Sequence, residues 1–210
     1  LTYIRFLDEE TGFGVDDLYK DHPATGVSWA GANEYATFYG LRLPSGVEWE
    51  VAARGTATDS TGNGTYLYPW TPNDYIDPMY ANYKYSGDPY ESSGNLRAST
   101  PVGSYDGTYM GTFPTVDAAG PFGTYDQAGN VAEWVKDWYD ADAWHDLLVD
   151  YLESGSEPID PQGPLTGTYR VVRGGSFFDN VAELRVTKRQ GSTPEVHSAK
   201  IGFRTVYTVF

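Results

Sequence analysis

The sequence contains no cysteine among its 210 residues. A chain without thiols cannot form disulfides, thiolate metal sites or a cysteine nucleophile. Cationic side chains are also scarce, with 14 Lys and Arg against 29 Asp and Glu, which gives a formal net charge of −15. This charge argues against nucleic-acid binding, because phosphates are neutralised by Lys and Arg. It is compatible with solubility alone or with binding of divalent cations.

Long apolar runs are missing too, because none approaches the roughly 18 residues that a membrane-spanning helix needs. We therefore expect a protein that is not transmembrane. The sequence begins at Leu1, without an initiator Met or a signal peptide, which favours a mature or trimmed fragment. Since the absence of Cys suits an exposed location, we expect the protein to be extracellular or on the cell surface.

Aromatic residues are abundant at 16%, and 24 Gly and 13 Pro predict many turns. Residues 56–125 lack periodicity but are rich in Tyr, so we expect a folded, irregular region rather than a disordered linker. The length fits one domain over residues 1–210, in which residues 139–167 read as an insertion containing a helix. The N-terminal segment TYIRFLDEE is predicted to be helical.

Two further helices have clear start and stop signals. Ser28 is a plausible N-cap of a helix that ends at Gly40. Ser45 begins the next helix, and its spacing from Glu48 is that of a capping box, with Gly55 at the end. Strands are predicted by alternation at 169–173, 183–188 and 202–210.

Four sequence blocks then occur in a recognisable order: VSWAGANEYATFYGLRLPSGVEWEVAARG at 27–55, DQAGNVAEWVKDW at 126–138, RVVRGGSFF at 170–178 and IGFR at 201–204. Together they resemble the formylglycine-generating-enzyme (sulfatase-modifying-factor) family. The resemblance implies an irregular α+β, C-type-lectin-like fold with two main helices, small antiparallel sheets and long loops. It also implies that the opening strands of the family precede Leu1.

The chemistry known for that family depends on residues that this chain lacks. Its oxidases bind copper through two cysteines after the RGGS segment, and the nearest positions here are Asp179 and Leu184. Its sulfoxide synthases use an H-x3-H-x-E iron site, whereas His22, His145 and His197 lie far apart in this sequence. We therefore expect no copper, no iron and no enzyme activity.

These arguments lead to the expectation of a non-catalytic, calcium-stabilised surface module that recognises a protein or glycan or associates with itself. The alternative is an oxidoreductase of the formylglycine-generating type.

A calcium site is implied by the resemblance at DQAGNVAE, because hard cations accept mixed carboxylate and carbonyl oxygens. The ligands would be the Asp126 and Glu133 side chains and the Gly129 and Val131 carbonyls. A second site would begin at Asn82 and Tyr83, with further ligands near 94–96. In the competing interpretation, the two carboxylates only cap a turn and pair with Arg or Lys.

The segment 179–193 overlies the substrate cleft of the family. Asp179, Arg185, Lys188 and Arg189 lie on it and are candidates to bind an anionic ligand or an acidic partner. Pairing of the cations with neighbouring carboxylates is the alternative. Trp134 is a candidate for a sugar or peptide platform, although Trp is more often part of the core. The RGGS glycines are interpreted as positions of close backbone packing, not as part of a nucleophile motif.

Overall fold

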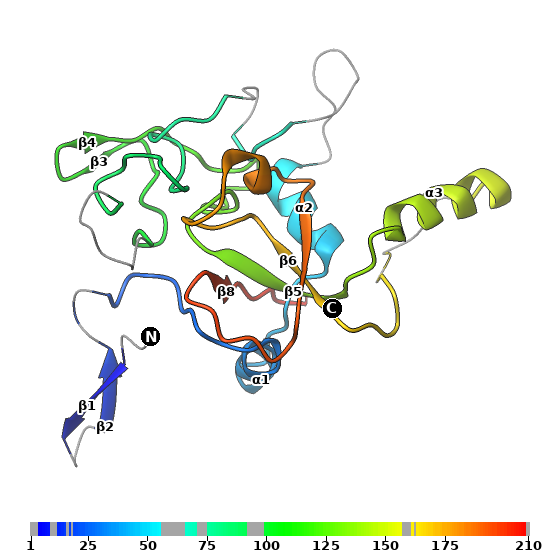
Figure 1. The fold of residues 1–210 in the computed structure, drawn as a ribbon, viewed down its shortest axis with the longest axis horizontal. Coiled ribbons are helices and arrows are strands. Elements are labelled where there is room, and N and C mark those ends of the chain that lie inside the picture. Colours follow the sequence, from blue (N-terminus) through cyan, green and yellow to red (C-terminus); the bar gives the residue numbers. More distant parts are fainter. Residues whose placement is uncertain are drawn as a thin grey trace.

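The computed structural model of the chain describes residues 4–8, 12–15, 17, 19–55, 66–70, 75–91, 99–156, 161 and 163–208. At its centre lies a four-stranded sheet in the order β7-β6-β5-β8 (Figure 1). The strands are β5 (Ala132–Trp138), β6 (Arg170–Arg173), β7 (Arg189–Ser192) and β8 (Ile201–Phe203). The β5–β8 pair is parallel and the other two pairs are antiparallel, so this sheet is mixed and not purely antiparallel as expected.

The sheet is packed between two helices, α1 (Trp29–Phe38) and α2 (Gly46–Arg54). Successive residues of β5 point to opposite faces, as in any strand. Trp134 packs in the cluster that includes Ala32 of α1, and Val135 packs in the cluster that includes Ala53 of α2. The two helices therefore cover opposite faces, and both faces of β5 are buried.

Both helices begin and end as predicted. The Ser28 side chain accepts a hydrogen bond from Gly31 N at the start of α1. At the start of α2, Ser45 and Glu48 form the full capping box, and Gly55 is the C-cap. These local signals place α2 so that Trp49 faces the core.

The irregular middle region contains a core of its own. The rings of Tyr68 and Trp70 stack at 5.3 Å between centroids, and Ala81, Tyr105 and Leu184 are buried with them. The only regular structure in its described part is a short hairpin of β3 (Tyr109–Met110) and β4 (Phe113–Pro114). The region is thus packed around aromatic side chains instead of a sheet.

Three predicted elements differ in the structure. The strand expected at 202–210 is the shorter β8 (Ile201–Phe203) within the described residues, and the other two elements change type. The N-terminal segment is not helical in its described part: β1 (Ile4–Asp8) pairs antiparallel with β2 (Gly12–Val15), because strand pairing overrides the helical composition. Residues 183–188 are not a strand either. A 3-10 helix, η1 (Val181–Leu184), leads to β7 instead, because Leu184 turns into the aromatic core.

The predicted helix in residues 139–167 is confirmed as α3 (Ala143–Ser154), which projects away from the sheet (Figure 1). Leu148 and Leu152 on it are exposed. No helix in the described part of the chain is both long enough and apolar enough to cross a membrane.

Candidate functional site

The RGGS segment follows β6 and is anchored by a buried arginine. The Arg173 guanidinium pairs with Glu50 Oε2 at 2.6 Å and donates to the Val186 and Lys188 carbonyls at 2.6 and 3.1 Å. A buried guanidinium is tolerated only when it is paired and hydrogen-bonded in this way. This network holds the end of β6 against α2 and against the segment before β7.

The glycines after Arg173 have the packing role that was predicted for them. Gly175 has φ +66°, and an added Cβ would lie 2.9 Å from Leu184 Cδ1 and 3.0 Å from the Glu183 carbonyl oxygen. A side chain fits neither the left-handed backbone nor the space. Leu184, one of the two positions matched to copper-binding cysteines, is fully buried in the aromatic core.

A tight turn follows, and the Asp179 carboxylate holds it together. Asp179 Oδ2 accepts from Ser176 N at 3.0 Å and from Ser176 Oγ at 2.6 Å, while Asp179 N donates to the Ser176 carbonyl at 2.9 Å. The fully buried Ser176 hydroxyl is therefore committed to the turn. The turn carries Phe178 outward, where 54% of this residue is exposed.

Two lysines from distant segments meet the exposed ring of Phe178. The Lys84 ammonium lies 5.4 Å and the Lys200 ammonium 4.9 Å from its centroid, and Lys84 is also 5.0 Å from the ring of Tyr85. The surface formed by Lys84, Tyr85, Phe178 and Lys200 is called the Phe178 face below. No carboxylate of the described residues forms an ion pair with either lysine.

The loop that carries Lys84 has a strained conformation. Tyr85 has φ +64°, a region that bulky residues rarely adopt, and 80% of the residue is exposed. The Glu91 carboxylate stabilises this conformation by accepting from Tyr85 N and from Gly87 N. Lys84 N donates to the Asp179 carbonyl at 3.0 Å, which joins the loop to the Phe178 turn. Strained backbone of this kind concentrates at functional sites.

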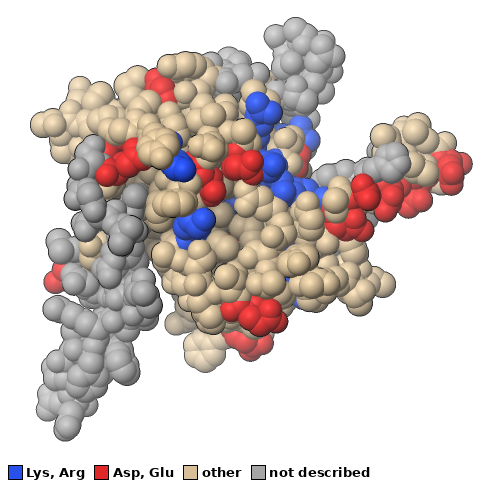
Figure 2. Space-filling model, viewed as in Figure 1, with Lys and Arg blue, Asp and Glu red and all other residues tan. Residues whose placement is uncertain are grey.

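The other predicted ligand-binding residues differ in exposure and in their hydrogen-bond and ion-pair partners. Arg185 is exposed, Lys188 pairs with Glu183 at 3.2 Å, and Arg189 donates to the Asp140 carbonyl at 2.9 Å. Trp134 is fully buried, and its indole N–H donates to the Val27 carbonyl, so it belongs to the core. Figure 2 shows one side of the molecule, on which Lys and Arg side chains gather across the middle, although the whole chain is strongly acidic.

Sequence analysis missed Lys84, Tyr85, Phe178 and Lys200 as a group. Tyr85 is one of 18 tyrosines, and the two lysines are 116 positions apart in the numbering of the chain. No sequence pattern signals that they converge on one ring.

The predicted calcium region contains a buried ion pair. Glu133 Oε2 accepts from Arg204 Nε at 2.5 Å and from Trp49 Nε1 at 2.6 Å, and Oε1 accepts from Arg204 Nη2 at 2.6 Å. Asp126 lies nearby with φ +60°, and its Oδ2 accepts from Gly103 N at 2.7 Å. Burial raises the pKa of Asp126 to about 6, although the Gly103 N–H and the Arg204 charge oppose the shift.

These residues fit a calcium ion only in part. Asp126 is a half-buried carboxylate without full charge compensation, which a cation would stabilise. Glu133 already has Arg204 as its counter-ion, so it would have to give up part of that pairing to bind metal.

Other predicted calcium ligands lie on the turn of Asp126 or contact it. Gly129 and Val131 follow Asp126 in the same turn, and the Asn82 carbonyl accepts from Asn130 N at 2.9 Å. Tyr83 comes next to Asn82, and the region 94–96 lies outside the described residues. Calcium stays a prediction.

Replacing Asp126 with asparagine distinguishes a carboxylate that binds calcium from one that only destabilises the fold. The pKa of Asp126 in the folded state lies above its ordinary value of about 3.9. Ionisation of Asp126 therefore lowers the free energy of unfolding as pH rises from about 4 to 6, and this loss of stability is complete above that range. Asp126→Asn is therefore expected to stabilise the protein at pH 8 in chelator, by up to about 3 kcal/mol, and to give no gain at pH 4. The measurement is urea unfolding at both pH values.

Asp117→Asn removes one charge at an exposed position and serves as the control. If calcium binds, millimolar calcium reverses the order, so that the unmodified protein is stabilised more than Asp126→Asn. Equal stability changes at pH 4 and pH 8 would contradict the assignment of a penalised carboxylate.

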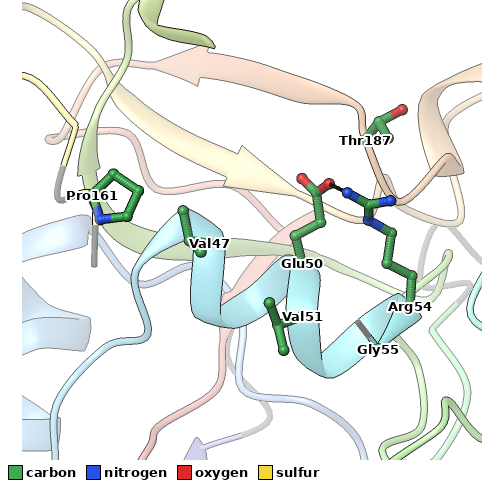
Figure 3. A pocket seen from close by; sticks show the side chains of 7 residues that line it. All are labelled: Val47, Glu50, Val51, Arg54, Gly55, Pro161 and Thr187. Carbon is green, nitrogen blue, oxygen red and sulfur yellow. Dashed lines mark ion pairs between the residues drawn. The ribbon is translucent and has the colours of Figure 1, made fainter. Parts of the chain in front are cut away.

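A separate hollow of about 470 Å³ lies along the outer face of α2 (Figure 3). Glu50 and Arg54 point toward one another within it, with an ion-pair distance of 2.9 Å, and Thr187 and Pro161 lie across from the helix. Glu50 and Arg54 are the charged residues of its lining, and they pair with each other. It therefore offers a ligand little electrostatic recognition.

Comparison with known proteins decides the family. Residues 8–209 match the Sulfatase-modifying factor enzyme 1-like domain. The chain belongs to this family. Formylglycine-generating enzyme from Thermomonospora curvata is 39% identical over 208 residues, which cover 93% of this chain and 58% of that protein. Hercynine oxygenase from Mycobacterium tuberculosis is 30% identical over 200 residues, which cover 95% of this chain and 40% of that protein.

Solved structures confirm the fold of this family member. PvdO from Pseudomonas aeruginosa superposes with a TM-score of 0.59 at 23% identity, covering 88% of this chain and 61% of that one. Treponema denticola variable protein 1 gives 0.58 at 22% identity, covering 91% and 73%. These likenesses show the predicted α+β, C-type-lectin-like fold.

The chain spans only part of the curated relatives that it matches. The share is 58% for the enzyme from Thermomonospora curvata and 25% for serine/threonine-protein kinase Pkn1 of Chlamydia trachomatis, which is 38% identical over 190 residues. The activities of those whole proteins are not transferred by this match.

The comparisons contradict the expectation that the chain is not an enzyme. Relatives named formylglycine-generating enzyme and hercynine oxygenase place it in an enzyme family, and they favour the oxidoreductase alternative over a module that only binds. The error has a physical reason. Absence of cysteine removes one set of metal ligands, whereas it leaves the rest of a substrate site intact.

Proposed function

We propose that the chain is an enzyme domain of the oxidoreductase class represented by its named relatives, and that it binds an anionic substrate on the Phe178 face. The observation that carries this proposal is the convergence of Lys84 and Lys200 on one exposed ring without a carboxylate partner in the described part of the chain. In a protein of net charge −15, such a surface is a specific feature and not a general property of the exterior.

The electrostatics of this face favour an anion. Both ammonium groups lie within 5.4 Å of the same ring centroid, so their charges repel at physiological salt, where the screening length is about 8 Å. An anionic group bound beside the ring offsets this positive charge, and the exposed rings of Phe178 and Tyr85 provide apolar contact area next to it. An acidic substrate with an aromatic or aliphatic part fits this combination.

The turn below the face supplies rigidity. The Asp179 carboxylate is committed to Ser176, and Lys84 N is bonded to the Asp179 carbonyl, so the loop that carries Lys84 is joined to the turn that carries Phe178. Preorganised groups bind with less loss of conformational entropy.

Redox chemistry on this face has to differ from thiolate-bound copper, since the chain has no cysteine. Within the described residues, no group of three His, Asp or Glu side chains is placed to hold a metal ion. The residues on this face therefore do not fit the copper site of the family, and no reaction step is assigned to such a metal.

The proposal that the Phe178 face binds an anionic substrate is tested with two matched peptides, Ac-Glu-Phe-Glu-amide and Ac-Lys-Phe-Lys-amide. Each is titrated against the full chain by calorimetry. The acidic peptide is expected to bind, with an affinity that falls as salt rises, and the basic peptide is not. The double variant Lys84→Ser/Lys200→Ser is expected to weaken binding of the acidic peptide about tenfold, or about 1.4 kcal/mol.

Lys188→Gln is the control, because Lys188 is paired with Glu183 and lies outside the Phe178 face. Equal binding of both peptides, or an unchanged affinity in the double variant, would contradict an anion site. The proposal that the chain is an oxidoreductase is tested separately. Peptides with acidic flanks are incubated with the full chain in air and under nitrogen, with copper or iron added, and are then examined by mass spectrometry. Bound peptides that are returned unchanged in every condition would count against it.

A further inference from the structure

A cavity of about 500 Å³ lies at the C-terminal end of β5, between α1 and the segment that leads into β6. Its walls include Trp29, Leu43, Asp137, Trp138, Leu165 and Arg170. The Phe178 face is tied to the other end of this region, since Phe177 N donates to the carbonyl of Asn130, which precedes β5. The cavity is therefore separate from the site proposed above.

A stacked arginine forms the positive group of this cavity. The Arg170 guanidinium lies between the rings of Trp29 and Trp138, with its carbon 3.6 and 3.5 Å from the two centroids. Its Nη1 donates to the Lys136 carbonyl at 2.6 Å, so the group is fixed in position. Its Nε is buried without an acceptor, and the described residues supply none for Nη2. This cation is held rigidly but is incompletely hydrogen-bonded.

A buried carboxylate forms the negative group. Asp137 Oδ2 accepts from Gly46 N at 2.6 Å, whereas Oδ1 receives no hydrogen bond from another described residue. Two glycines keep the space around Oδ1 open: an added Cβ would lie 3.1 Å from it at Gly163 and 3.5 Å from it at Gly46. Burial raises the pKa of Asp137, as expected for a carboxylate that lacks full compensation.

Arg170 and Asp137 line the same cavity, but they do not form an ion pair with each other. This distinguishes the cavity from the hollow along α2, where Glu50 is paired with two arginines. Arg42 also lines the cavity, and its charge is matched by Glu48 at 2.5 Å. Lys136 lines the cavity as well. Arg170 and Asp137 are the cation and the anion that the surrounding groups hold in fixed positions, beside an apolar wall.

We propose that this cavity binds a small zwitterion, namely an α-amino acid with an apolar side chain. The carboxylate of the ligand contacts the outer edge of Arg170, whose planar guanidinium is suited to carboxylates. The ammonium group contacts Asp137 Oδ1. The side chain packs on Leu43, Trp138 and Leu165, and covering Leu165, which is 93% exposed, adds to the binding energy.

The test uses the full chain and three probes of nearly equal size: L-leucine, L-leucinamide, which lacks the carboxylate, and 4-methylpentanoate, which lacks the ammonium group. Binding is measured by calorimetry and by tryptophan fluorescence, since Trp29 and Trp138 flank Arg170. Leucine is expected to bind at least tenfold more tightly than either analogue, because each analogue loses one charged contact. Absence of saturable leucine binding, or equal affinity for all three probes, overturns the proposal.

Two variants assign the contacts. Asp137→Asn keeps an acceptor for Gly46 N and is expected to weaken leucine at least tenfold while leaving 4-methylpentanoate unweakened. Leu165→Glu adds a carboxylate at an exposed rim position and is expected to weaken both acids, which provides a test even if Asp137→Asn does not fold. Glu34→Gln, an exposed loss of charge on α1, is the control that leaves all affinities unchanged. Unaltered leucine affinity in folded Asp137→Asn or in Leu165→Glu overturns the proposal.

Discussion

Replacing Gly129 with alanine is expected to cause the largest loss of stability among the single substitutions considered. Gly129 has φ +84°, and an added Cβ would overlap the Asn82 carbonyl oxygen and approach Leu184 Cδ2 to 3.2 Å. The left-handed backbone alone costs an alanine about 1 kcal/mol, and the overlap with a buried main-chain atom adds more, so the total exceeds about 4 kcal/mol. Circular dichroism and urea unfolding measure the loss.

Gly111→Ala is the matched control for this variant. Gly111 has φ +64°, yet nothing lies within 4 Å of its added Cβ. It is therefore expected to lose only about 1 kcal/mol, the conformational part of the effect. If both variants lose the same stability, the contact between Asn82 and the turn at Gly129 is not as close as described.

Replacing Glu133 with glutamine is expected to cost about 3–5 kcal/mol. The change turns an acceptor oxygen into a donor amide beside Arg204 and leaves the guanidinium without its counter-ion. Solvent cannot compensate fully, because the side chains of Glu133 and Arg204 are only 6% and 25% exposed. The free energy of unfolding in urea is the quantity to measure.

Lys188→Gln breaks a surface ion pair instead, since the side chains of Lys188 and Glu183 are 42% and 32% exposed. It is expected to cost less than about 1 kcal/mol. The double variant Glu133→Leu/Arg204→Met removes both buried charges and is expected to recover part of the loss. A loss in Glu133→Gln no larger than in Lys188→Gln would show that the buried pair contributes little.

The parts of the fold that were predicted correctly are those encoded locally. Ser45 and Glu48 are three residues apart, so the capping box of α2 is visible in the sequence and forms as expected. The parallel pairing of β5 with β8 was not predictable in the same way, because its register joins Ala132 to Ile201. Pairing between distant segments depends on the whole packed structure and leaves no local signal.

The same difference between local and long-range signals explains which candidate sites could be predicted from the sequence. Asp126 and Glu133 were singled out because both belong to one contiguous block, although the pairing of Glu133 with Arg204 was not foreseen as the dominant contact. The Phe178 face and the cavity lined by Arg170 and Asp137 each combine segments that are far apart in the chain. The expectation that the chain is not an enzyme failed for another reason, since it relied on the missing copper and iron ligands of the family.

The position of Arg204 has a consequence for synthesis of the chain. Glu133 is built into the central strand early, but its counter-ion comes after β8, near the end of the described residues. Until those last residues leave the ribosome, the growing chain has neither the edge strand beside β5 nor the charge that allows Glu133 to be buried. Folding of the central sheet is therefore completed after translation of this segment, and the partly made domain remains a substrate for chaperones until then.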